Sequence, residues 1–200
     1  MACLEASIGG ENSMKILTDR LILREVESKD AKDLVKLLNN INVTKWMLVF
    51  PYPYTKKDAK QYVSIAEKSR KEKSRKAYSF SIELKDSKNL IGGINLSRID
   101  FFQGTAITSY WLGQDYWRNR YGSEAFQALL DFAFKKLKLR RISGSVYPGN
   151  PSSGKLLEKY GFKREGYARE SHLCKADGKI KDSISYGLLR SEYKQSGRKK

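Results

Sequence analysis

The stretch Tyr116-Trp117-Arg118-Asn119-Arg120-Tyr121-Gly122-Ser123-Glu124-Ala125 decides the fold, because the sequence pattern changes across it. The residues before it, 105–112, are rich in β-branched and aromatic side chains and predict a strand. After it, the apolar residues recur with the spacing of one helix face: Ala125, Leu129, Phe132, Ala133 and Leu137. The stretch itself is therefore predicted to be a polar loop that leads into a long helix.

This junction is also a candidate anion site. The first N–H groups of a helix have no partner within it, and the helix dipole favours negative charge at that end. Arg118 and Arg120 add guanidinium groups that suit phosphate oxygens, and Gly122 would let the backbone approach a ligand closely. The stretch lacks both the Gly-Lys-Ser/Thr ending of a P-loop and the G-x-G-x-x-G pattern of dinucleotide-binding proteins.

A second junction of this kind lies at residues 146–153. Asn150 is a good helix cap, and Pro151 suits the first position of a helix. Asn150 and Ser153 are three residues apart, so their side chains can lie together near the helix start. On the residues alone, Asn150 can equally be a plain cap and Ser153 an ordinary first-turn residue.

The rest of the chain predicts a mixed α/β fold in one domain. A strand over residues 16–26 is followed by a helix capped at Ser28 and a second helix capped at Thr55. The other strands are expected at residues 78–84, 90–99, 105–112 and 141–146, with a closing hairpin of residues 162–174 and 180–189. The predicted order is β-α-α-β-β-β-α-β-α-β-β, with an antiparallel meander in the middle.

The composition excludes several classes of protein. The chain has 200 residues, of which 40% are hydrophobic, so it is too apolar to be disordered and long enough to bury one core. Its cysteines, Cys3 and Cys174, cannot form a disulfide framework, and with His172 as the single histidine no Cys/His zinc site is expected. No metal is therefore expected.

The net charge is the strongest feature of the composition. Lys and Arg number 39 against 22 Asp and Glu, which gives +17 and an electric field that attracts polyanions. Apolar stretches such as 46–50 are far shorter than the ~20 residues that span a bilayer, and no secretory signal pattern is present. We therefore expect a cytoplasmic protein without a membrane partner. Residues 1–13 are expected to be a flexible leader, 14–193 the folded domain and 194–200 a basic tail.

Several blocks of sequence, in the right order, resemble the GNAT acyltransferase superfamily. Within it they are most similar to the RimJ/RimL-like branch, which acetylates the N-termini of ribosomal proteins. The resemblance extends from Leu17 to about Tyr193. Its blocks are residues 17–24, 110–112 with 117–125, 150–153 followed by 157–162, and 165–167 with Asp182 and 186–189.

The resemblance implies an N-acetyltransferase that uses acetyl-CoA. In this fold a mostly antiparallel sheet, flanked by helices, splays apart at two central parallel strands, and the cosubstrate lies in the gap. Here those strands would be residues 105–112 and 141–146. Backbone groups of Tyr110, Trp111 and Leu112 would bind the pantetheine arm. The pyrophosphate would be held by Trp117, Arg118, Asn119, Arg120, Tyr121, Gly122 and Ser123.

The second helix start would complete this site, since the resemblance implies that Asn150 and Ser153 contact the cosubstrate there. Many superfamily members carry a tyrosine general acid seven residues after this Asn, but here that position is Leu157. Ser153 is therefore the expected proton donor to the leaving CoA thiolate. A further departure is Arg120, which stands where the loop usually has its middle glycine, and whose side chain either crowds the pyrophosphate or swings outward.

A base must take a proton from the acceptor amine, and its pKa should lie near the working pH. Histidine meets this requirement without tuning, with an ordinary pKa of about 6.5, so His172 is the preferred candidate. Glu83, Glu170 and a relaying water are the alternatives. A backbone donor near Leu112 would stabilise the tetrahedral intermediate. The acetyl group would pass directly to the amine in a ternary complex, so Cys174 need not take part.

The acceptor is expected to be the N-terminal amine of a protein, because of the branch resemblance and because a basic surface suits a target near ribosomal RNA. A small amine such as a polyamine or an antibiotic is the alternative, although a field of +17 disfavours a polycation. A third interpretation, favoured by Arg120, is a non-catalytic RNA- or ribosome-associated protein on the same fold. Both a monomer and a homodimer are compatible with the sequence.

Overall fold

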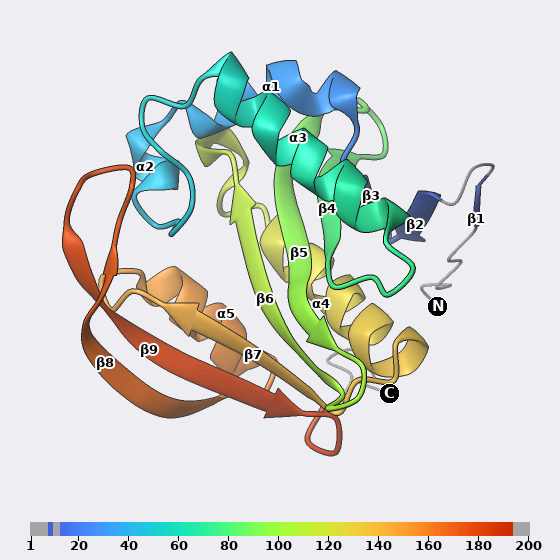
Figure 1. Ribbon diagram of the computed structural model, residues 1–200, viewed down its shortest axis with the longest axis vertical. Helices are drawn as coiled ribbons and strands as arrows, with labels where there is room; N and C mark the ends of the chain where they lie inside the picture. Colours follow the sequence, from blue (N-terminus) through green and yellow to red (C-terminus); the bar gives the residue numbers. More distant parts are fainter. Residues whose placement is uncertain (1–7, 10–12, 194–200) are drawn as a thin grey trace.

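A mixed sheet forms the centre of the computed structural model, which describes residues 8–9 and 13–193 (Figure 1). Over those residues it has nine strands in the order β1-β2-β3-β4-β5-β6-β7-β9-β8. Only β6 and β7 are parallel, and the other neighbours are antiparallel. This confirms the predicted mixed α/β class with a mostly antiparallel sheet. The strands are β1 (Ile8–Gly9), β2 (Ser13–Leu17), β3 (Leu21–Glu25), β4 (Tyr78–Leu84), β5 (Leu90–Asp100), β6 (Thr105–Leu112), β7 (Arg141–Val146), β8 (Lys163–Leu173) and β9 (Ile180–Leu189).

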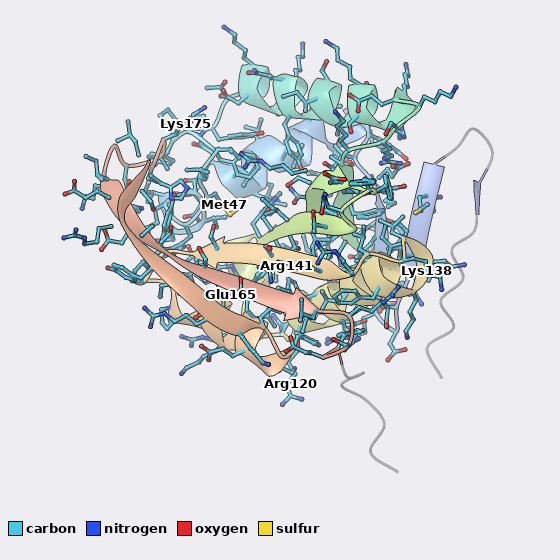
Figure 2. All side chains as sticks on the ribbon, turned by 60° about the horizontal axis from the view of Figure 1, so that its bottom comes forward. Met47, Arg120, Lys138, Arg141, Glu165 and Lys175 are labelled. Carbon is cyan, nitrogen blue, oxygen red and sulfur yellow. The ribbon has the colours of Figure 1, made fainter. Side chains whose placement is uncertain are left out.

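Helices cover both faces of the sheet (Figure 1). The helices α1 (Ala31–Leu38) and α3 (Lys56–Lys71) pack against each other on one face, and α2 (Ile41–Thr44) is a short helix beside them. The other face carries α4 (Tyr121–Asp131), which continues as a π-helical segment (Phe132–Lys136), and α5 (Pro151–Lys159). Long side chains project from the outer face of α3 into solvent (Figure 2).

The alternation of side chains along β6 joins the two layers. Successive side chains of a strand point to opposite faces of the sheet. Trp111 packs against Phe50 in the apolar cluster under α1 and α3, whereas its neighbour Tyr110 packs against Phe126 of α4. One strand in the middle of the sheet therefore fixes the positions of helices on both sides.

The structure differs from the expected pattern at the N-terminal end. The strand predicted over residues 16–26 is two strands, β2 and β3, separated by a turn in which Thr18 N–H donates to Leu21 O (3.0 Å). The first helix is preceded by a 3₁₀ turn (Ser28–Asp30), whose Asp30 carboxylate accepts the N–H of Glu27, so Ser28 is not the cap. The predicted caps Thr55 and Asn150 are confirmed, since their side chains accept from Asp58 N–H and Ser153 N–H respectively.

The predicted terminal segments lie mostly outside the described residues. Of the expected leader, only Ile8–Gly9 and Ser13 are described, and they belong to β1 and β2, which pair with each other. The expected basic tail, 194–200, is not described. Within the described ranges, none of the helices combines the length and the apolar composition that a membrane span requires.

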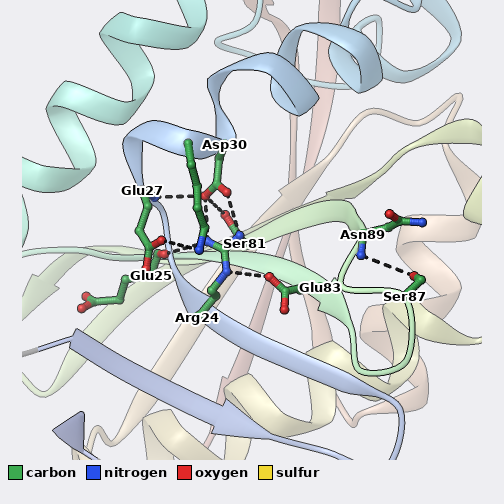
Figure 3. Close-up of polar contacts among 9 residues, drawn as sticks. Arg24, Glu25, Glu27, Asp30, Ser81, Glu83, Ser87 and Asn89 are labelled. Atoms are coloured by element: carbon green, nitrogen blue, oxygen red, sulfur yellow. Dashed lines mark hydrogen bonds and ion pairs between the residues drawn. The ribbon is translucent and has the colours of Figure 1, made fainter. Parts of the chain in front are cut away.

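A buried ion network ties β3, β4 and the start of α1 together (Figure 3). Arg24 of β3 donates two hydrogen bonds to the carboxylate of Asp30 (2.7 and 2.9 Å) and one to Glu83 of β4 (2.8 Å). Ser81 adds a hydroxyl to Asp30 (2.8 Å), and all four residues are buried. Burial alone would raise the pKa of Asp30, but the hydrogen bonds from Arg24, Glu27 and Ser81 outweigh it, and the net shift is downward.

The Arg24→Met variant is expected to lose about 3–5 kcal/mol of unfolding free energy in urea denaturation, because two buried carboxylates lose their cation. A matched control is Lys29→Met, which removes the exposed ion pair with Glu27 (2.7 Å) and should cost no more than about 1 kcal/mol. Since the pKa of Asp30 is lowered by folding, its stabilising contribution is present above pH ~4 and is lost as the pH falls below that. A loss below about 1 kcal/mol for Arg24→Met would contradict this account.

Candidate active site

The two parallel strands separate after a short paired region. β6 and β7 pair only at Thr105–Arg141, Ala106–Ile142 and Ile107–Ser143. Beyond this point β6 stays paired with β5 up to Leu112, and β7 stays paired with β9 up to Val146. The two strands diverge from a common end (Figure 1), which confirms the predicted splay. We call the region between the diverging halves the opening.

Backbone groups of β6 face this opening. At the end of the strand, Gly113 N–H donates to Ile91 O of β5 (2.9 Å). Hydrogen-bonded pairs alternate along an antiparallel ladder, so the N–H and C=O groups of Trp111 also face β5, whereas those of Tyr110 and Leu112 face the opposite way. Leu112 O accepts from the indole N–H of Trp117 (2.9 Å). The remaining groups, the N–H and C=O of Tyr110 and the N–H of Leu112, are available to a ligand in the opening.

The loop between β6 and α4 ends in an uncapped helix start. Arg118 and Arg120 both have φ of +63°, the left-handed conformation that glycine adopts most easily. Arg120 is the residue before α4, and no side chain in the described part of the chain caps this helix. Its own side chain is exposed and points away from the body of the protein (Figure 2), so it leaves the N–H groups of residues 121–123 accessible. Gly122 lies against the ring of Tyr110, but a Cβ there would make only ordinary van der Waals contact (3.5 Å), so packing does not require glycine at this position.

Lys159 lies at this helix start, although the sequence reasoning did not single it out. Its ammonium is 2.5 Å from the hydroxyl of Ser123, in the first turn of α4, and the hydroxyl of the next residue, Tyr160, donates to Ser123 O (2.6 Å). A cation beside the positive end of a helix dipole is electrostatically unfavourable unless an anion lies between them. The arrangement makes the start of α4 a candidate anion site. The only sequence signal was the position of Lys159 in the 157–162 block.

The turn between β2 and β3 holds the loop in place. Glu124, in the first turn of α4, accepts from the Thr18 hydroxyl (2.6 Å) and from the backbone and side chain of Arg20 (both 2.8 Å). Arg20 also donates to Asn119 O (3.2 Å), and its guanidinium lies over the ring of Tyr121 (4.6 Å to the centroid). Burial alone would raise the pKa of Glu124, but these hydrogen bonds hold it below its ordinary value. The ionised carboxylate thus fixes the loop from outside the opening.

The start of α5 brings Ser153 to the side chain of Tyr110. Asn150 Oδ1 accepts the N–H of Ser153 (3.3 Å), so the plain capping role of Asn150 is present. The hydroxyl of Ser153 is 3.3 Å from that of Tyr110, across the elements that border the opening. Leu157, at the position where many relatives place a tyrosine, is only 5% exposed and lies in the apolar core.

The hairpin of β8 and β9 carries His172 to the end of β7. The ring of His172 is 6.2 Å from that of Tyr147, which directly follows β7, and its Nδ1 bonds the hydroxyl of Ser171 (2.8 Å). At the tip of the hairpin, Lys181 Nζ donates to Lys45 O (2.6 Å). The indole of Trp46 in turn lies within van der Waals distance of Gly149, just before α5. The hairpin tip, residues 45–47 and the start of α5 therefore meet at the end of β7.

The two alternative carboxylates are placed differently. Glu83 is bound to Arg24 in the buried network on β4, and β5 separates that strand from β6. It therefore lies away from the opening and is already paired. Glu170 is exposed on β8, where its backbone N–H donates to Asp182 Oδ1 (2.8 Å).

The Glu124→Gln variant is expected to lose about 1 kcal/mol of unfolding free energy and to show faster hydrogen exchange at residues 117–123, with β9 unchanged. The reason is the loss of charge-assisted hydrogen bonds to Arg20. Because folding lowers the pKa of Glu124, the stability difference should be present above pH ~4.3 and shrink as the pH falls below it. The control is Glu72→Gln, an exposed position at the end of α3. Unchanged exchange in the loop would refute the clamp.

Comparisons with known proteins agree on one family. Residues 20–163 match the family model of the acetyltransferase (GNAT) domain. The chain is 34% identical to the uncharacterized N-acetyltransferase p20 of Bacillus licheniformis, over 89% of this chain and 97% of that protein. It is 26% identical to the [ribosomal protein uS5]-alanine N-acetyltransferase of Escherichia coli, over 90% of this chain and 93% of that protein. A GNAT-family acetyltransferase structure from Bacillus anthracis superimposes with a TM-score of 0.75 at 27% identity, covering 90% of this chain and all of that one. The chain therefore belongs to the GNAT acetyltransferase family and is an acetyl-CoA-dependent N-acetyltransferase.

Proposed function

We propose that this protein transfers the acetyl group of acetyl-CoA to the N-terminal amine of a protein, by direct attack in a ternary complex. The proposal rests on two neighbouring features. The separated half of β6 has backbone groups that are not paired with β7, and the start of α4 has no side-chain cap and lies beside the Lys159 ammonium. Such a site suits a long ligand that has amide groups along one part and phosphates at the other. Acetyl-CoA has this chemistry, and it supplies the activated thioester for the transfer.

The residues present fit this cosubstrate. The N–H and C=O of Tyr110 would bind the amides of the pantetheine arm, as strand backbone does in a sheet. The N–H groups of residues 121–123 would bind the pyrophosphate, with Lys159 and Arg118 supplying positive charge. Trp111 was expected to bind the arm through its backbone, but its N–H and C=O face β5 and its indole is buried on the other face of the sheet, so it has no direct part in the proposed site.

Three groups of this chain are assigned separate roles in the transfer. Ser153, held at the start of α5, is the proposed donor of a proton to the leaving sulfur. His172, at the end of β7, is the proposed base for the acceptor amine, either directly or through water. The N–H of Leu112, which faces the opening, is the proposed donor to the oxygen that becomes negative in the transition state.

The Lys159→Met variant is expected to bind acetyl-CoA about 10-fold more weakly, because a charge-assisted contact to a phosphate is lost. The affinity is measured by isothermal titration at several salt concentrations, and the variant should show a smaller salt dependence than the wild type. Lys155→Met, an exposed change on the same helix, is the control. Equal affinities for the two variants would argue against a phosphate at the α4 start.

Two observations support a protein N-terminus as acceptor. One curated relative, at 26% identity, is a [ribosomal protein uS5]-alanine N-acetyltransferase. In addition, Lys45 places a cation beside the hairpin tip, where Lys181 is paired with Asp177 (2.8 Å), and this disfavours a polycationic acceptor such as a polyamine. The alternative of a non-catalytic RNA-associated protein loses its main support, since the Arg120 side chain is exposed and points out of the body of the protein (Figure 2).

An acceptor series distinguishes these functions. The wild-type protein, acetyl-CoA and one acceptor at a time are incubated, and CoA release and product mass are measured. We expect acetylation of a peptide with a free N-terminal alanine, and none of the same peptide with a blocked N-terminus and an internal lysine. Acetylation of spermidine in preference to the peptide would instead establish the small-amine alternative.

A basic surface at the closed end of the parallel pair supports an RNA-rich location for the acceptor. Phe102, at the tip of the β5–β6 hairpin, is 94% exposed. Arg140 donates to Gln103 O of this hairpin, and Arg190 donates to Lys138 O (3.3 Å), so the hairpin and these cations are adjacent. Figure 2 shows Lys138 directed outward. An exposed aromatic ring beside cations suits stacking and phosphate contacts in RNA, and we infer that this surface binds ribosomal RNA, in a protein expected to be cytoplasmic.

The double variant Lys138→Ser/Arg190→Ser is expected to bind ribosomal subunits more weakly, with the slope of log K against log salt reduced by roughly 2, while its acetylation of a free peptide is unchanged. Binding is measured by sedimentation at several salt concentrations. Lys56→Ser/Lys57→Ser on α3 removes the same charge elsewhere and is the control. Equal losses in both variants would mean a general charge effect rather than a docking surface.

A further inference from the structure

We propose that Tyr110 and Ser153 form a proton relay, in which the phenol of Tyr110 is the source of the proton that Ser153 delivers to the leaving sulfur. The inference deepens the proposed function and rests on it. It assigns a chemical role to a side chain whose backbone alone was expected to take part.

The geometry brings the two hydroxyls together from different elements. Tyr110 is on the separated half of β6 and Ser153 is on the first turn of α5, and their oxygens are 3.3 Å apart. Among the described residues, the hydroxyl of Ser153 is the one hydrogen-bonding partner of the Tyr110 hydroxyl. Both side chains are fixed, since the ring of Tyr110 packs on Phe126 (5.8 Å between centroids) and on Gly122, and Ser153 is held through its capped N–H.

The chemistry explains why a second hydroxyl is needed. A serine hydroxyl is a very weak acid, so a serine that protonates a sulfur has to regain a proton in the same event. A phenol, with an ordinary pKa of about 10, is much closer to a thiol at about 8.5. In many relatives a tyrosine on this helix would supply the phenol, but here that position is the buried Leu157. The phenol comes instead from β6.

The electrostatics of Tyr110 suit a group that holds its proton until it is needed. Burial raises its pKa, and the hydrogen bond with Ser153 opposes this only in part. The phenol therefore stays protonated at neutral and mildly alkaline pH. Two other tyrosines have different partners: the hydroxyl of Tyr160 bonds Ser123, and that of Tyr186 donates to Glu158 (3.2 Å).

The proton balance of the relay is complete. As the carbon–sulfur bond breaks, the electron pair goes to sulfur, the Ser153 hydroxyl gives its proton to sulfur, and Tyr110 gives its proton to the Ser153 oxygen. The resulting phenolate regains a proton from solvent, which receives the one lost by the acceptor amine. No oxidant or metal is required.

The first test is a double-mutant cycle on kcat. We expect Ser153→Ala to lower kcat about 100-fold and Tyr110→Phe about 10-fold, as typical for loss of general acid catalysis. Because the two groups act in series, the double variant should match Ser153→Ala within about twofold. Independent losses that multiply to about 1,000-fold would overturn the relay. Tyr78→Phe, a buried tyrosine on β4 that is bonded to Arg75 only through its ring face, is the matched control.

The second test measures binding without turnover. Free CoA and desulfo-CoA, which lacks the sulfur, are titrated at pH 7 and pH 9.5. A protonated relay stabilises the thiolate form of CoA. In the wild type and in Tyr78→Phe, the ratio of the Kd for desulfo-CoA to the Kd for CoA should therefore be about 10-fold larger at pH 9.5 than at pH 7. In Tyr110→Phe this pH-dependent preference should be lost. A purely structural role of Tyr110 would instead weaken both ligands equally at both pH values, and that result would overturn the proposal.

The outcomes separate the relay from the proposed function. If the wild type binds CoA and acetylates the peptide but Tyr110→Phe keeps both its kcat and its preference for the thiolate, only the relay is wrong. If the wild type binds neither CoA nor desulfo-CoA, the proposed function itself fails.

Discussion

The structure depends on one constraint, which is that the parallel ladder between β6 and β7 stops after three residue pairs. Each strand remains held on its other side, β6 by β5 and β7 by β9, so neither can return to close the ladder. Polar backbone groups left unpaired inside a protein carry a free-energy cost unless another partner satisfies them. The opening therefore has backbone groups that a ligand with amide groups could pair, and it lies beside the uncapped start of α4.

The parts that shape the opening are anchored at a distance from it. Glu124 joins the β2–β3 turn to the first turn of α4 and fixes the loop through Arg20. The buried Arg24 network, which β5 separates from β6, joins β3 and β4 to the start of α1. Neither cluster includes a residue of the separated halves of β6 and β7.

The sequence predicts most of the elements, because their signals are local. Strand periodicity, the caps Thr55 and Asn150 and the loop before α4 are written in neighbouring residues, and the structure has them. The turn between β2 and β3 was missed because Glu124, which stabilises it, is about a hundred residues away. The contacts of Lys159 and of the Tyr110–Ser153 pair depend on where α5 packs. Glu83 was a candidate base in the sequence because its partner, Arg24, lies on another strand. Non-local contacts of this kind leave no periodic signal.

The measurement that tests the central claim most directly is thermal unfolding of the full chain with acetyl-CoA or with ATP, at moderate salt. If the opening and the α4 start form one site for acetyl-CoA, saturation at ~100-fold over Kd should add about 2.7 kcal/mol and raise Tm by roughly 5–10 °C. ATP, which has phosphates but no pantetheine arm, should change Tm little. Equal shifts with both ligands, or no shift with acetyl-CoA, would contradict the account.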